Sequence, residues 1–310
     1  MNSKMLKIGI SSGLLAGVLA PSAVHACACG CGIFDVGGPT MLPSGPGGMV
    51  WGEFDYQNQN RDWNGASKGD PDNNGDKRIQ TEFTMVGMQY MFNTVWGLEA
   101  EAPYDFRYFK GTDGNGNIAT HSWSELGDIR VNAIYTGFSD DLSTGLTLGL
   151  KLPTGRFDED SFLVDRDTQL GTGSTDVLLG AFHRGKIGHG TGFEWFVQGL
   201  LDVPVASQGQ YIPGTEFDSD IGIDYTGFSV GNVRIVPLAQ VLFSAREHDS
   251  GNNADELDTG YERVLLSPGV EFDVSKFRIY ADAEVPVYQY FRGNQLAAPV
   301  LLKCSFTYMF

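Results

Sequence analysis

After its amino terminus, the sequence lacks any apolar run of about 18 residues, the length that a membrane-spanning helix requires. Basic residues are also scarce, since 21 lysines and arginines face 38 aspartates and glutamates, for a formal net charge of -17. Nucleic-acid-binding proteins neutralise phosphates with clustered Lys and Arg, so this class is excluded and no nucleic-acid partner is expected. Aromatic residues make up 12% of the chain and apolar residues 42%, which excludes a disordered chain.

Catalytic motifs are missing as well. The sequence contains no H-E-x-x-H metalloprotease helix and no phosphate-binding loop of the G-x-x-x-x-G-K-[ST] type. A nucleophile and a base cannot be placed together by sequence spacing. We therefore expect that the protein is not an enzyme.

Residues 1–26 have the features of an export signal. Lys4 and Lys7 form a short positive region, the apolar stretch Ile8–Ala20 follows, and small residues precede a cleavage point after Ala26. The stretch has no polar face, which disfavours an amphipathic first helix of the fold. We expect the chain to leave the cytoplasm and to lose this segment.

Residues 27–48 form a Cys-rich and then Gly/Pro-rich segment, which we place in the periplasm. Cys27, Cys29 and Cys31 lie in the phrase CACGCG, and three thiolates so close together are suited to a soft metal such as Cu(I) or to Zn. Lipidation of Cys27 and disulfide formation in an oxidising compartment are the alternatives, and the sequence leaves all three open. No Cys-x-x-Cys-His occurs, so covalent haem attachment is not expected. Cys304 is predicted to face lipid and is not an expected partner of the cluster.

The remaining sequence alternates between apolar and polar residues with a period of two. In Trp96–Tyr108, one face is apolar or aromatic at every position, whereas the other carries Glu99, Glu101, Asp105 and Arg107. A helix would scatter these charges around its circumference, but a strand places them on one side. The same division recurs in residues 146–153 and 277–286.

Twelve such segments predict an all-β fold, a single transmembrane antiparallel β-barrel over residues 49–310. The strands are expected near Met49–Asn58, Gln80–Phe92, Val95–Tyr108, Leu126–Phe138, Thr144–Pro153, Thr175–His183, Gly192–Val205, Asp220–Phe228, Val233–Arg246, Tyr261–Val274, Phe277–Tyr290 and Ala298–Phe310. Short links alternate with long polar ones, including Gln59–Ile79, Lys110–Glu125, Thr154–Ser174 and Phe291–Ala297. Short periplasmic turns and long extracellular loops are typical of bacterial outer-membrane barrels, so we expect an integral protein of the cell outer membrane. The alternative is a soluble β-sandwich, which does not need an apolar face on nearly every strand.

The last strand agrees with this interpretation. Val300, Leu302, Cys304, Phe306, Tyr308 and Phe310 share one face, and the chain ends on an aromatic residue. This ending resembles the recognition signal of the outer-membrane assembly machinery. We therefore expect that machinery as a partner of the Phe310 strand, together with outer-membrane lipid and lipopolysaccharide.

If the apolar faces meet lipid, the opposite faces line the interior. The predicted pore-lining residues are Glu99, Glu101, Asp105, Arg107, Asp128, Arg130, Lys151, Asp202, Arg278, Asp282 and Glu284, and Glu53, Asp55 and Arg234 have the same parity. Acids exceed bases in this set, so an open pore would favour cations. A packed interior of paired charges without conduction has the same sequence pattern and stays open as an alternative.

The polar loops contain one phrase with the opening of a calcium loop. Asp70, Asp72, Asn74 and Gly75 have the right spacing, but Thr81 stands where such a loop needs a bidentate Glu. Turn formation explains the same residues, so no calcium site is expected in the extracellular loops.

Five phrases carry a resemblance to a known family: GLEAEAPY, LGDIRVNAIY, LGLKLPTG, GTGSTDVLLGAF and LLSPGVEF. They resemble the outer-membrane barrel family named for a meta-pathway role in phenol degradation, which also includes the exporter of bacterial functional amyloid. The resemblance spans Met49 to Phe310 and implies a small outer-membrane barrel that acts as a transporter or channel. The chain departs from the amyloid exporter, because residues 33–48 are short and rich in Gly and Pro where the exporter has a coiled-coil extension.

The sequence thus predicts an outer-membrane channel or transporter for small solutes, either cations or small hydrophobic or aromatic compounds, with an acidic lumen. The alternative is a non-conducting barrel that binds a metal or docks a partner through CACGCG. A homo-oligomer and a monomer are both compatible with the pattern.

Overall fold

The computed structural model describes residues 41–113 and 115–310. Strands and two single-turn 3-10 helices follow one another along the chain. They are β1 (Gly47–Gln59), β2 (Arg61–Gly65), β3 (Ser67–Lys68), η2 (Pro71–Asn73), β4 (Asp76–Met91), β5 (Trp96–Thr112), β6 (Ile118–Leu126), β7 (Ile129–Tyr135), β8 (Thr144–Leu152), η3 (Arg166–Thr168), β9 (Ser174–Ile187), β10 (Phe193–Ser207), β11 (Glu216–Tyr225), β12 (Phe228–Val230), β13 (Val233–Arg246), β14 (Tyr261–Val274), β15 (Phe277–Ala297) and β16 (Leu301–Met309).

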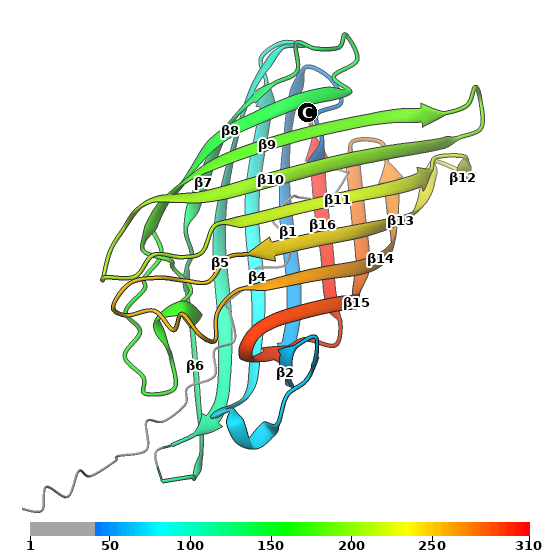
Figure 1. Ribbon diagram of the computed structural model, residues 1–310. Helices are drawn as coiled ribbons and strands as arrows, with labels where there is room; N and C mark the ends of the chain where they lie inside the picture. Colours follow the sequence, from blue (N-terminus) through cyan, green and yellow to red (C-terminus); the bar gives the residue numbers. More distant parts are fainter. Residues whose placement is uncertain (1–40, 114) are drawn as a thin grey trace, which may run out of the picture.

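The strands form a closed antiparallel barrel, which confirms the predicted fold class. β1 pairs with β4 on one side and with β16 on the other, so the first and last strands close the ring. The barrel has twelve strands, because β6 and β7 are two parts of one interrupted strand, as are β11 and β12, and the β2–β3 hairpin lies outside the ring. The long loops gather toward one end, whereas the carboxyl terminus lies at the other (Figure 1).

Side chains that point out of the barrel are apolar on strand after strand. Val86, Leu148 and Ile221 are 62%, 59% and 57% exposed, and similar residues cover the outer wall. A continuous exposed apolar wall of this kind is stable against lipid tails and not against water. Among the described residues, no helix is long and apolar enough to cross a membrane.

The expected single strand Leu126–Phe138 is interrupted, and the expected loop Lys110–Glu125 is largely strand. β5 continues to Thr112 and β6 begins at Ile118, so this hairpin extends beyond the neighbouring strands. The interruption lies opposite Pro103, whose oxygen accepts a hydrogen bond of 2.9 Å from the nitrogen of Gly127. Because proline has no N–H to donate in return, the ladder shifts by one residue here.

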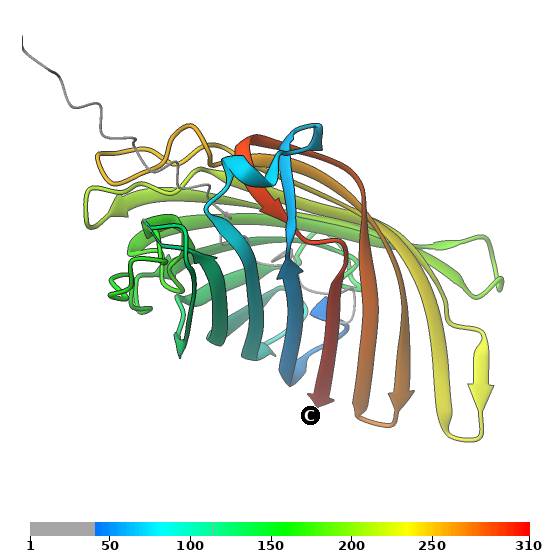
Figure 2. The same cartoon turned by 90° about the horizontal axis from the view of Figure 1, so that it is seen from below.

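The expected link Phe291–Ala297 also proves to be strand. β15 runs to Ala297 and pairs with β2, which lies within the expected loop Gln59–Ile79. Figure 2 shows this hairpin against the end of β15. Burial of Phe291, Tyr261 and Ala297 against Trp63 stabilises the extension, a long-range contact that strand periodicity does not indicate.

Candidate functional site

The inward faces of the strands carry polar side chains. In β1, Glu53, Asp55 and Gln57 are buried, whereas the alternating Val50 and Phe54 are exposed to the outside. Alternate residues of a pleated strand point to opposite faces, so the sequence places one set in lipid and the other in the lumen.

Acidic side chains dominate the buried charges. Among the described residues, fifteen buried side chains are aspartate or glutamate, and four are basic: Arg107, Lys151, Arg263 and Lys303. Further arginines, such as Arg130 and Arg234, line lumenal cavities. The interior therefore carries an excess of negative charge.

The structure places the sequence-predicted residues as follows. A lumenal cavity of about 150 Å³ is lined by Asp105, Asp128, Arg130, Lys151 and Asp202. A second cavity, of about 80 Å³, is lined by Glu99, Glu101 and again Arg130, and a third, of about 140 Å³, by Arg278 and Arg234. The remaining predicted residues, Arg107, Asp282 and Glu284, are buried. Residues from four strands and from the interruption between β6 and β7 thus line the first cavity together, whereas Arg278 lies apart from them in the third.

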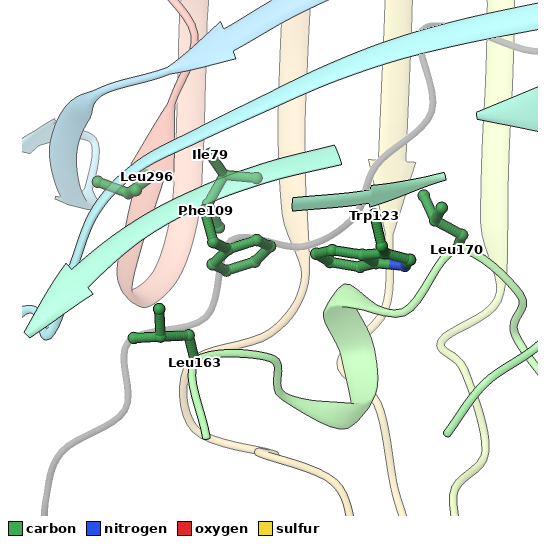
Figure 3. Packing of buried hydrophobic residues seen from close by; sticks show 6 residues of the cluster. All are labelled: Ile79, Phe109, Trp123, Leu163, Leu170 and Leu296. Atoms are coloured by element: carbon green, nitrogen blue, oxygen red, sulfur yellow. The ribbon is translucent and has the colours of Figure 1, made fainter. Parts of the chain in front are cut away.

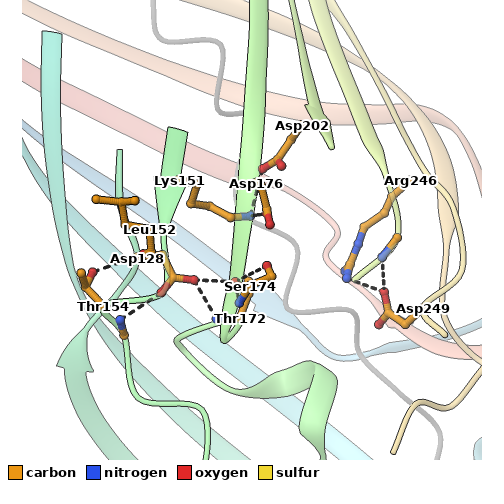
Figure 4. A network of polar contacts seen from close by, with 12 residues as sticks. Asp128, Lys151, Leu152, Thr154, Thr172, Ser174, Asp176, Asp202, Arg246 and Asp249 are labelled. Carbon is orange, nitrogen blue, oxygen red and sulfur yellow. Dashed lines mark hydrogen bonds and ion pairs between the residues drawn. The ribbon is translucent and has the colours of Figure 1, made fainter. Parts of the chain in front are cut away.

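Lys151 is the centre of one charged group in this lumen. Its ammonium contacts Asp176 and lies 2.9 Å from Asp202 Oδ2 (Figure 4). Two carboxylates therefore surround one ammonium.

Sequence reasoning missed a second group of the same kind around Lys303. Its Nζ lies 3.4 Å from Glu53 Oε1 and 3.9 Å from Asp55 Oδ2. In β16, Lys303 pairs with Asp55 of β1 and Asp282 of β15. The alternation of the last strand is the signal that could have indicated this group. Cys304 faces outward and is exposed, so its neighbour Lys303 must face the lumen.

A loop between β8 and β9, residues 153–173, folds against the barrel wall and is called the lumenal loop here. Asp128, at the interruption between β6 and β7, accepts hydrogen bonds from the Gly155 nitrogen (2.9 Å), the Thr172 nitrogen (2.8 Å) and the Thr172 hydroxyl (2.6 Å) (Figure 4). Arg107 of β5 donates hydrogen bonds to the backbone oxygens of Thr168 and Gln169 in the loop. Both predicted lumenal residues thus bind the loop.

Both ends of the lumenal loop come very close together. A Cβ atom on Gly171 would lie 2.3 Å from the carbonyl carbon of Gly155, a distance that no side chain tolerates. These glycines belong to the phrases LGLKLPTG and GTGSTDVLLGAF. Because glycine has no side chain, the two ends of the loop can approach each other this closely.

An apolar cluster packs the lumenal loop against the extracellular part of the barrel. Leu163 and Leu170 of the loop contact Phe109 of β5 and Trp123 of β6, and Ile79 and Leu296 complete the cluster (Figure 3). The Phe109 and Trp123 rings stack with centroids 5.8 Å apart. The lumenal loop is therefore fixed to the barrel wall both by apolar packing and by the hydrogen bonds of Asp128.

The lumenal loop also contacts two neighbouring loops. The Arg166 guanidinium lies over the rings of Phe157 and Tyr211, 4.7 Å and 4.3 Å from their centroids. Tyr211 donates a 2.6 Å hydrogen bond to Asp249, which also lies 2.6 Å from Arg246. Three extracellular loops are thus linked through residues 157–166, 211 and 249.

Burial changes the protonation of one acid of the lumenal loop. Burial, reinforced by the nearby Asp249, raises the pKa of Asp167 to about 8. The carboxyl is 8% exposed, and its Oδ2 has no hydrogen-bond partner among the described residues. The closed loop therefore favours the neutral form of Asp167 at neutral pH.

At the other end of the barrel, residues 41–43 lie inside the wall. Gln89 donates a 3.1 Å hydrogen bond to the Met41 oxygen, and Arg184 donates a 2.8 Å bond to the Pro43 oxygen. Leu42 packs against Met91 and other apolar residues of this end. The segment before β1 therefore narrows the periplasmic end.

The predicted export signal and Cys27, Cys29 and Cys31 lie outside the described residues. Within the described part, no group of three or more His, Cys, Asp or Glu residues is arranged to hold a metal ion. In the calcium-like phrase, Lys77 donates hydrogen bonds to the Pro71 and Asn74 backbone oxygens, so an ammonium of the chain itself lies at this turn.

Comparisons with known proteins agree with this geometry. The model of a family described as "Putative MetA-pathway of phenol degradation" matches residues 58–299. An outer-membrane channel from Pseudomonas putida F1 has a similar structure, with a TM-score of 0.63 and 13% identity over 87% of this chain and 97% of that one. The β domain of the Bordetella autotransporter BrkA follows with a TM-score of 0.53 and 13% identity, over 85% of this chain and 100% of that one. No protein with a curated description matches the sequence.

Proposed function

This chain belongs to the family described as "Putative MetA-pathway of phenol degradation", and we propose that it is a gated outer-membrane channel that passes small solutes through an acidic lumen. Its fold is that of an integral outer-membrane β-barrel, as in the Pseudomonas putida channel.

The observation that carries the proposal is the way in which the lumen is closed. The wall itself leaves a polar interior, and the lumenal loop occupies its extracellular part through side-chain contacts of Asp128 and Arg107. A loop held by a few hydrogen bonds and one apolar cluster can leave the lumen without any change in the strands. We assign the loop as the gate for this reason.

The charge of the interior supports a preference for cations. Carboxylates surround Lys151 and Lys303 in excess, and the acids Glu99, Glu101 and Glu284 extend the negative field along the lumen. A ring of acids concentrates cations in a pore and repels anions.

Conductance in a planar bilayer tests the proposal, with a salt gradient that reports the ion selectivity. We expect stepwise, cation-selective currents whose reversal potential moves toward zero when Glu99, Glu101 and Glu284 are together changed to Gln. The matched control changes the exposed loop acids Asp72 and Asp158 to Asn and Glu256 to Gln, which leaves the selectivity nearly unchanged.

A folded barrel that stays silent in the wild type and after removal of the Asp128 side chain would contradict the channel. Anion-selective current would contradict the acidic lumen as its filter. A silent barrel would favour a scaffold that acts through Cys27, Cys29 and Cys31, with copper or zinc content lost in the triple Ser variant as its test.

A further inference from the structure

The cavity of about 150 Å³ beneath the lumenal loop has one apolar wall. Phe83, Met85 and Pro103 contribute to it from β4 and β5, and Leu170 contributes from the loop. A cavity of about this size holds a single six-membered ring when its lining is apolar. The apolar wall therefore fits a small hydrocarbon group.

The rest of the lining is charged, and its basic groups already have partners. Lys151 contacts Asp176 and Asp202, Arg246 contacts Asp249, and Arg166 donates to the Thr172 oxygen at 2.5 Å. Arg130, the fourth basic residue of the lining, also has a partner in the protein, so all four cations of the cavity are engaged by the protein itself. An anionic ligand would have to compete for them.

Several acids of the same lining have a carboxyl oxygen that accepts no hydrogen bond within the described chain, and Asp55 and Asp167 are two of them. Asp55 Oδ1 and Asp167 Oδ2 have no hydrogen-bond partner among the described residues, and the two side chains belong to residues only 5% and 8% exposed. A buried carboxyl oxygen without a hydrogen-bond partner is costly, whether the group is neutral or ionised. A ligand that brings N–H donors and positive charge would remove this cost.

We propose that this cavity is a binding site for small organic cations, in which an apolar group of one ring lies against Phe83, Met85 and Leu170 and an ammonium donates to both Asp55 and Asp167. The proposal rests on the proposed channel function and narrows its solutes to amines. A bare metal ion is not the expected ligand, because the described acids do not converge as metal ligands do.

The pH dependence of binding follows from Asp167. Burial raises the pKa of Asp167 to about 8, with Asp249 and Asp255 of the 247–260 loop adding to the rise and Arg246 of β13 opposing it. An ammonium binds the ionised carboxylate, so it must replace the proton. Affinity is therefore expected to increase from about pH 6 to about pH 8.

Isothermal titration of the purified full-length barrel with three probes of one shape tests the site. Benzylamine, benzyl alcohol and benzoate carry the same ring with a positive, a neutral and a negative substituent. At about pH 8 we expect benzylamine to bind about tenfold more tightly than benzyl alcohol, and benzoate to bind most weakly. Asp167→Asn and Asp55→Asn should each weaken benzylamine about tenfold and leave benzyl alcohol unchanged.

Asp158→Asn is the matched control, because this acid lies on the same loop with a side chain that is 75% exposed. The site is rejected if benzyl alcohol or benzoate binds as tightly as benzylamine, if none of the probes binds, or if neither lumenal variant changes the affinity. Binding does not require conduction. A barrel that binds benzylamine but does not conduct would contradict the channel and support the site. A barrel that conducts but does not bind benzylamine would support the channel and contradict the site.

Discussion

At the scale of single residues, Asp128 connects the barrel wall to the lumenal loop. Both of its carboxylate oxygens accept hydrogen bonds from the lumenal loop, two of them from backbone N–H groups. Asp128→Ala leaves the Gly155 and Thr172 amides without their acceptor, so it should make loop closure less favourable by about 3 kcal/mol. Hydrogen exchange of the Thr172 amide, with Asp158→Ala as control, measures the loss. Unchanged protection of this amide would contradict the role of Asp128.

Asp167 gives the same loop a dependence on pH. Its pKa is about 8 in the closed loop and near the usual 3.9 in an open, hydrated loop, so closure favours proton uptake. Closure is therefore most stable below about pH 4 and weakens as the pH rises to about 8, by at most about 1.4 kcal/mol per pH unit. Above about pH 8 the effect is complete.

Open probability in bilayers across this pH range measures the effect. Asp167→Asn mimics the neutral acid and should flatten the profile, whereas the contact between His121 and Glu159 remains in both proteins. Equal pH profiles for the wild type and Asp167→Asn would exclude Asp167 as the sensor.

At the scale of elements, the carboxyl-terminal strand combines pairing with an exposed aromatic end. Phe310 exchanges backbone hydrogen bonds of 2.9 Å and 3.2 Å with Gly48, and its ring stacks on Tyr90. We propose that this end is read by the assembly machinery, so deletion of Phe310 should reduce the amount of assembled barrel severalfold in cells. Phe310→Tyr should assemble normally.

Heat-modifiable migration in gels measures the assembled fraction. Refolding of the deletion variant in detergent separates recognition from stability, because recognition by the machinery plays no part there. If the variant fails equally in detergent and in cells, the aromatic end acts through stability alone.

The strands could be predicted from the sequence, because a barrel in lipid imposes alternation on each of them. The lumenal loop could not, since Leu163 and Leu170 lie in an aperiodic polar stretch and are buried only by partners far along the chain. The same holds for the extension of β15, which depends on contacts with Trp63. Asp128 was predicted to be lumenal from parity, but its contacts with the loop depend on the shift opposite Pro103, which the pattern does not reveal.

At the scale of the whole molecule, the interior and the outer loops share one sign of charge. The formal net charge of -17 adds a long-range negative potential to the local fields around Lys151 and Lys303. Cation selectivity should therefore fall with ionic strength, since the Debye length decreases from about 10 Å at 0.1 M salt to about 3 Å at 1 M. Reversal potentials at one fixed concentration ratio, in dilute and in concentrated salt, measure this decline. If the selectivity does not change with ionic strength, it arises from direct contacts between the cation and the lumen and not from long-range electrostatics.

The seam between β1 and β16 has a consequence for synthesis of the protein. Strands from the two ends of the chain meet there, from Met49 with Met309 to Gln57 with Leu301. Every product that a ribosome releases before Leu301 lacks one side of this seam and leaves the backbone groups of two strand edges unpaired. An early stop codon therefore does not yield a smaller barrel but an open sheet, which is a substrate for proteases and a template for aggregation.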